Sequence, residues 1–149
     1  MSLLKLLREQ QQRLHDLTQL LQQERNLLAS ADMGGQALTD LATHKQELLA
    51  KLEATEAMRQ RVQRRLGYAE GTVGARQAAM EAGCLEAWDS TLELTREARR
   101  LNTLNGELVG LRMAQNSRLL DFIHQAAEKT VYRASGRVAA QSGRFNASV

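Results

Sequence analysis

Residues 3–30 read LLKLLREQQQRLHDLTQLLQQERNLLAS, and their leucines recur with the period of an amphipathic α-helix. One leucine in every seven residues falls on the same helix face, namely Leu7, Leu14, Leu21 and Leu28. Gln10 and Glu24 interrupt the neighbouring apolar stripe. A strict coiled coil would keep both stripes apolar, so the pattern predicts a helix that packs in a bundle.

Two further helices are expected after this one. Residues 30–35, SADMGG, disfavour helix and predict a short connection. An apolar face recurs over about residues 36–66, so the first two helices are expected to form an antiparallel hairpin. A third helix is predicted over about residues 80–127, with its first residue between Ala75 and Leu85. Four clustered glycines predict a linker before it: Gly67, Gly71, Gly74 and Gly83.

The last part of the chain has a different character. Residues 130–149 mix Ser, Gly, Ala and Arg without a helical period, which predicts a flexible tail. Residues 1–129 are expected to form one domain, an elongated antiparallel three-helix bundle or coiled coil. The predicted fold class is therefore all-α.

Composition points to the same fold class. The 149 residues include no proline and only 3% aromatics, whereas 25 Leu, 21 Ala, 16 Arg and 14 Gln make up half of the chain. These four residues favour helix, and a β protein would use proline in its turns. The cluster from Leu3 to Leu7 is too short and polar for a membrane span or a signal peptide. The single Cys84 agrees with a reducing compartment, so a cytoplasmic protein is expected.

No set of residues predicts catalysis or metal binding. Di-iron helical bundles use Glu-x-x-His pairs, and the nearest match in this sequence is Asp121-x-x-His124. His15 and His44 have no second ligand at metal-binding spacing. Cys84 has no neighbouring His that would activate it and is expected to be a small buried hydrophobic residue. We therefore expect no enzyme activity, no cofactor and no metal.

A basic run raises the question of nucleic-acid binding. It comprises Arg59, Arg61, Arg64 and Arg65, and a net charge of +3 does not by itself require such a partner. On a helical wheel the last three share an arc, and Arg59 lies on the other side of the apolar face. Three charges without aromatic stacking platforms favour a solvated helix face over phosphate binding, so no nucleic-acid partner is expected.

Asn102, Asn105 and Gly106 occur in the middle of the third predicted helix. Asn and Gly both disfavour a helix interior, Gly by about 1 kcal/mol relative to Ala. Two interpretations stay open. Asn pairing across the bundle would fix the register of the helices, and Gly106 would allow a close approach of two backbones. Alternatively, the three residues belong to a partner-binding surface.

Four segments together resemble the FlgN family of bacterial flagellar export chaperones. They are Leu20–Asp32, Leu38–Glu53 followed by Arg59 and Leu66-Gly67, Arg99–Leu108 with its Asn-x-x-Asn-Gly followed by Asn116 and Leu119-Leu120, and Tyr132–Arg137. The segment Arg99–Leu108 is the most specific, because leucine motifs occur in every helical bundle. The resemblance covers residues 1 to about 137 in order.

The resemblance implies a cytoplasmic chaperone that binds the termini of the hook-associated proteins FlgK and FlgL and delivers them to the flagellar type III export apparatus. Three helices cannot bury every apolar side chain of the third one, so its C-terminal half and the tail are expected to bind the client. The expected partner-binding residues are Leu101, Asn102, Leu104, Asn105, Gly106, Leu108, Leu111, Leu119, Phe122, Ile123 and Tyr132. The alternative is a structural or adaptor coiled coil that self-assembles through the same leucines, for example as a homodimer.

Overall fold

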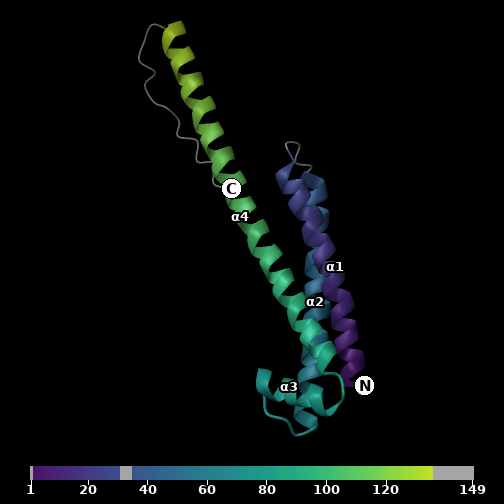
Figure 1. Cartoon of the computed structure of the whole chain (residues 1–149). Helices are drawn as coiled ribbons and strands as arrows, with labels where there is room; N and C mark the ends of the chain where they lie inside the picture. The colour runs from purple at the N-terminus through teal and green to yellow at the C-terminus, as the bar shows by residue number, and fades with distance from the viewer. Residues whose placement is uncertain (1, 31–34, 136–149) are drawn as a thin grey trace. The chain divides into compact units, whose positions relative to one another are not determined.

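The computed structural model describes residues 2–30 and 35–135, and only the backbone of residues 130–135. It contains α1 (Leu3–Ala29), α2 (Gly35–Arg65), α3 (Thr72–Glu81) and α4 (Leu85–Ser135), as Figure 1 shows. The described residues form no β-strand, and the prediction of an all-α fold is confirmed. The chain divides into two compact units, residues 1–105 and 106–149, and each is treated by itself below.

In the first unit, α1 and α2 form the expected antiparallel hairpin. Ser2 caps α1 by accepting a hydrogen bond from the backbone N–H of Lys5. Cross-helix polar contacts join the N-terminal half of α1 to the C-terminal half of α2: Arg13 donates to the Lys51 carbonyl and to the Thr55 hydroxyl. The predicted break after Ser30 agrees with α1 ending at Ala29, whereas residues 31–34 lie outside the described residues.

The core of the first unit lies along α1, whose heptad leucines are buried as predicted: Leu7, Leu14, Leu21 and Leu28. One cluster joins the middle of α1 to α2 and α4, with Leu17 and Leu21 against Ala98 and Leu101, and with Leu48, Leu49 and Leu52 packed around them. A second cluster joins the start of α1 to α3 and the start of α4. The leucine pattern in residues 3–30 thus identifies the central helix of this unit.

The sequence predicted a linker where the structure has the additional helix α3. Three small side chains, Ala75, Ala78 and Ala79, bury one face of this ten-residue helix in the cluster that contains Leu7 and Trp88. A face made of alanines produces little hydrophobic contrast, so the periodicity of this segment does not reveal a helix. The third predicted helix accordingly begins at its latest expected position, Leu85.

Two of the clustered glycines have definite structural roles at the ends of α3. Gly74 lies where an added Cβ would come within 1.7 Å of the Ala69 carbonyl oxygen, so only glycine fits there. Gly83 has φ +72° in the turn between α3 and α4, a conformation that favours glycine. These residues end and begin helices rather than forming an open linker.

Helix α4 extends beyond its predicted end at residue 127 and reaches Ser135. Residues 128–135, EKTVYRAS, contain neither Gly nor Pro, and the first helix-disfavouring residue after them is Gly136. The assignment of residues 130–135 to a flexible tail is therefore wrong, and the rest of the predicted tail lies outside the described residues. No helix in the described part of the chain is both long and apolar enough to cross a membrane.

Candidate functional site

Asn105 is a buried polar residue that links α4 to α1. Its side chain is 1% exposed, and its Nδ2 donates to the Leu21 carbonyl at 2.8 Å and to Glu24 Oε1 at 2.9 Å. Glu24 Oε1 also lies 3.6 Å from Lys45 Nζ on α2. Asn105, Glu24 and Lys45 therefore connect all three long helices of the first unit at one level. The interpretation that Asn105 pairs across the bundle is confirmed.

The neighbours of Asn105 have different environments. Leu101 is buried with the leucines of α1, whereas Leu104 is half-buried and Asn102 is exposed. A Cβ added to Gly106 would meet no atom within 4 Å, so the prediction of a close backbone approach there is wrong. Leu101 and Asn105 thus face the interior of the bundle, whereas Asn102, Leu104 and Gly106 are reachable from solvent to different degrees.

The second unit exposes an apolar stripe on α4. We use the name α4 stripe for five residues that share one helix face within an arc of about 80°: Leu108, Leu111, Gln115, Leu119 and Phe122. Leu111 is 60% exposed and Phe122 is 68% exposed, and Ile123 beside the stripe is also exposed. Exposed apolar side chains that lie together on one face are typical of a binding site. The side chain of Tyr132 lies outside the described residues.

The first unit has an apolar groove with a volume of about 550 Å³ between α2 and α4. Leu14, Leu17 and Leu21 of α1 line it together with Leu52 of α2 and Leu92 of α4, and the last two are only half-buried. We call it the α2–α4 groove. Sequence reasoning did not anticipate it, because a period shows which helix face is apolar but not whether two such faces meet.

Two polar atoms that lack partners belong to residues lining one end of this groove. Gln10 is 6% exposed and donates through Nε2 to Glu56 Oε2 at 2.7 Å, but its Oε1 has no hydrogen-bond partner among the described residues. Trp88 is 7% exposed, and its indole Nε1 likewise has no partner there. Because an unsatisfied buried polar group lowers stability, this end of the groove favours an occupant that supplies a donor and an acceptor.

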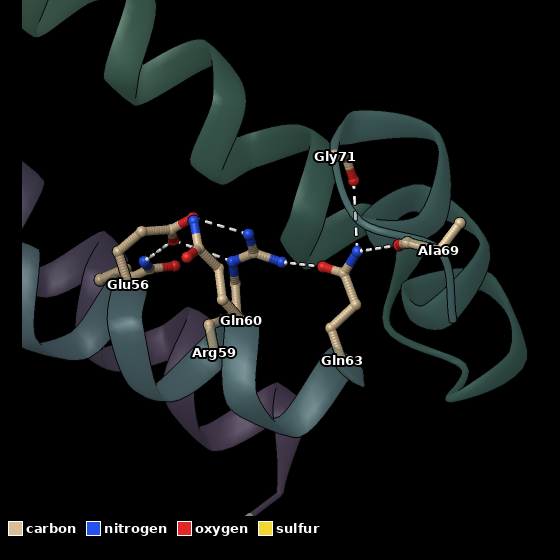
Figure 2. Close-up of polar contacts among 7 residues, drawn as sticks. Glu56, Arg59, Gln60, Gln63, Ala69 and Gly71 are labelled. Atoms are coloured by element: carbon tan, nitrogen blue, oxygen red, sulfur yellow. Dashed lines mark hydrogen bonds and ion pairs between the residues drawn. The ribbon is translucent and has the colours of Figure 1, made fainter. Parts of the chain in front are cut away.

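Arg59 organises a polar network beside the groove (Figure 2). Its side chain is 5% exposed and donates to both Glu56 oxygens, at 2.8 and 2.6 Å, and to Gln63 Oε1 at 2.7 Å. Gln63 Nε2 in turn donates to the Ala69 and Gly71 carbonyls, which holds the segment before α3. The guanidinium carbon lies 4.9 Å from the centre of the Trp88 ring, a cation–π contact. Arg59 is thus an internal residue, apart from the exposed Arg61, Arg64 and Arg65.

The network also sets the ionisation of Glu56. Partial burial by itself would raise the pKa of this carboxyl group, but hydrogen bonds from Arg59 and Gln10 and the charge of Arg59 outweigh burial. The pKa of Glu56 therefore lies below its ordinary value, and the group is ionised at neutral pH.

The described residues offer little for catalysis. They contain no group of three His, Cys, Asp or Glu side chains placed to hold a metal ion. Cys84 is 4% exposed and packs with Leu7 and Trp88, as expected for a small hydrophobic residue. Burial raises the pKa of its thiol, which disfavours the reactive thiolate. The groove and the α4 stripe present apolar side chains, which are typical of binding surfaces.

Comparison of the chain with known proteins identifies its family. The family model described as FlgN protein matches residues 1–140. The chain belongs to the FlgN family. The Flagella synthesis protein FlgN of Proteus mirabilis is 26% identical over 124 residues, which cover 83% of this chain and 81% of that protein. No solved structure matches the chain.

Membership confirms the resemblance on the four sequence segments and assigns the chain to a chaperone family of flagellum biogenesis. Polar residues from three of those segments, Glu24, Lys45 and Asn105, meet in one contact between α1, α2 and α4. Their spacing along the chain therefore reflects how the bundle is held together. The α4 stripe lies outside this contact.

Proposed function

We propose that this FlgN-family protein is a cytoplasmic export chaperone that binds an amphipathic terminal segment of the hook-associated proteins FlgK and FlgL. Binding keeps these clients from associating prematurely, and the complex delivers them to the flagellar type III export apparatus. The observation that carries the proposal is the exposed apolar face of α4 in the second unit, where Leu111, Leu119, Phe122 and Ile123 are all more than half exposed.

The chemistry of the α4 stripe fits such a client. Apolar side chains spaced three and four residues apart on one helix face pair with the apolar face of another helix. A client segment that self-associates through its own apolar face would be covered in the same contact. Ordering a client segment on binding costs about 2–5 kcal/mol, which favours an affinity moderate enough for release.

Two substitutions test where the client binds. Burying one leucine side chain contributes about 1.5–3 kcal/mol, so Leu108→Asp with Leu111→Asp is expected to weaken FlgK binding by more than 100-fold in a titration calorimeter. Truncation after Lys129 removes the remaining predicted contacts, including Tyr132, and should also weaken binding. Circular dichroism should show unchanged helix content for the double variant.

A matched control separates this effect from a general loss of apolar surface. Leu66 follows α2 and is 59% exposed, compared with 60% for Leu111. Leu66→Asp should bind FlgK as the unmodified chain does. Full FlgK affinity in both the Leu108→Asp/Leu111→Asp variant and the truncated chain would refute the proposed location of the client site.

A further inference from the structure

We propose that the α4 stripe of a second copy of this chain occupies the α2–α4 groove, so that two chains form a symmetric dimer. Both surfaces carry apolar side chains: six leucines and Trp88 line the groove beside polar residues, and the stripe exposes Leu111, Leu119 and Phe122. Because α1, α2 and α4 all line the groove, a fourth helix could pack against all three at once. The occupant would complete a four-helix arrangement.

Charges on the two surfaces are spaced to match. On α2, Lys45 lines one end of the groove, and Glu56 lines it eleven residues further on, one turn before Gln60 at the other end. Beside the α4 stripe, Glu107 precedes Arg118 by the same eleven residues. Eleven residues of helix span about 16 Å on either element. A stripe running parallel to α2 therefore places Glu107 next to Lys45 and Arg118 next to Glu56.

Helix geometry supports this one orientation. Glu107 and Arg118 lie on the same edge of the stripe, about 20° apart on a helical wheel. With the stripe facing α1 and running parallel to α2, the right-handed turn of the helix directs this edge toward α2. Reversing the direction with the stripe still facing α1 would turn this edge from α2 toward α4, so neither Glu107 nor Arg118 would meet its partner on α2. Glu53, one turn before Glu56 on the groove wall, adds a second acidic neighbour for Arg118.

The register also supplies the missing polar partners at the end of the groove. Gln115 is the one polar member of the α4 stripe and lies three residues before Arg118. The matched charges therefore place Gln115 within one turn of the level of Glu56, to which Gln10 donates a hydrogen bond. Its amide has both the N–H donor that Gln10 Oε1 lacks and the oxygen acceptor that Trp88 Nε1 lacks.

A second copy is the occupant because every copy of the chain carries both the groove and a stripe whose charges have the matching spacing. Exchange between two copies satisfies both surfaces at once. Each chain contributes one groove and one stripe, which is the self-complementary arrangement of a two-fold symmetric dimer. The dimer forms without a client. Its consequence that a client and a second copy compete for the stripe rests on the proposed function.

Sedimentation equilibrium of the full chain tests the dimer through a charge-exchange cycle. Glu53 and Arg118 are both exposed, so their substitution should leave the fold intact, as circular dichroism can verify. An exposed ion pair changes an equilibrium by roughly 1.4- to 5-fold, and a symmetric dimer contains the pair twice. Glu53→Arg and Arg118→Glu are therefore each expected to weaken dimerisation by about tenfold. The double variant should recover most of the lost affinity.

Arg8→Glu is the matched control, because Arg8 is exposed on α1 and does not line the groove. It changes net charge as Arg118→Glu does and should leave the dimer unchanged.

Trp88 is the only tryptophan in the sequence, so its indole N–H gives a single nuclear magnetic resonance signal. This signal should shift on dimerisation of the unmodified chain and should shift less in the Gln115→Ala variant. A chain that stays monomeric, a cycle without recovery in the double variant, or an equal effect of Arg8→Glu would overturn the proposal.

Discussion

Asn105 shows how one polar side chain can determine the position of a helix in an apolar bundle. Its amide reaches the main chain of α1 at Leu21 and the carboxylate of Glu24, and both contacts depend on the register of α4 against α1. Leucines around it pack acceptably in several registers, whereas the amide N–H groups meet these two acceptors in one. We therefore expect the leucines to supply most of the bundle's stability and Asn105 to select the register of α4 against α1.

Replacing Asn105 tests that division of roles. Asn105→Ala leaves a small cavity and removes two hydrogen bonds, so it should lower the free energy of unfolding by about 2–3 kcal/mol in urea titrations. Asn105→Leu should lose less stability but broaden the nuclear magnetic resonance signals of α4, because alternative registers become accessible. Asn102→Ala, an exposed amide on the same helix, should change the unfolding free energy by less than about 0.5 kcal/mol. Equal losses at both positions would contradict a register role for Asn105.

Glu56 predicts a pH dependence of stability. Because its pKa in the folded chain lies below the ordinary value of 4.5, the unfolded chain binds more protons as the pH falls through this range. The stabilising contribution is present in full above that value and is lost as the pH falls through the folded pKa. Urea titrations between pH 6 and 3 should therefore show a smaller loss of stability for Glu56→Gln than for the unmodified chain. Glu47→Gln, at an exposed position of α2, should retain the steeper dependence.

Within the helices, two glycines that look alike in sequence have opposite roles. Gly74 lies in α3 against the Ala69 carbonyl, and Gly106 lies in α4 with open space where a Cβ would be. Gly74→Ala should destabilise the chain and loosen α3, because the backbone must move to admit the methyl group. Gly106→Ala should raise the unfolding free energy by about 0.5–1 kcal/mol, since alanine favours helix. Thermal unfolding of both variants checks the pair, and a loss of stability in Gly106→Ala would contradict open space at that position.

The sequence predicted some elements of the fold and missed others, for physical reasons that differ from element to element. The heptad leucines of α1 predicted a helix that packs in a bundle, and Asn105 stood out as a helix-disfavouring residue in the middle of a predicted helix. Helix α3 was not predicted, because its buried residues are mainly alanines, which produce no strong hydrophobic period. The α2–α4 groove was not predicted, because in the sequence its leucines cannot be told apart from leucines of the core. Whether their side chains meet depends on the distance between helices, which no local pattern contains.

For the whole molecule, the two proposals together predict competition. If a client and a second copy both use the α4 stripe, added FlgK should convert dimers of this chain into complexes that contain one copy. Sedimentation velocity at a fixed chain concentration should show the dimer disappearing as FlgK is added. The variant Glu53→Arg, which weakens the dimer without altering the stripe, should bind FlgK at lower concentrations than the unmodified chain. A complex that retains two copies would contradict competition while leaving client binding itself intact.

The central claim is that the exposed face of α4 binds the client. It is tested most directly by leucine methyl nuclear magnetic resonance of the full chain with and without FlgK, recorded on the weakly dimerising Glu53→Arg variant. The account predicts large shifts for Leu108, Leu111 and Leu119 that saturate with FlgK, and unchanged signals for the buried Leu3 and Leu7 near α3. Shifts confined to the leucines of the first unit, or no shifts at saturating FlgK, would contradict it.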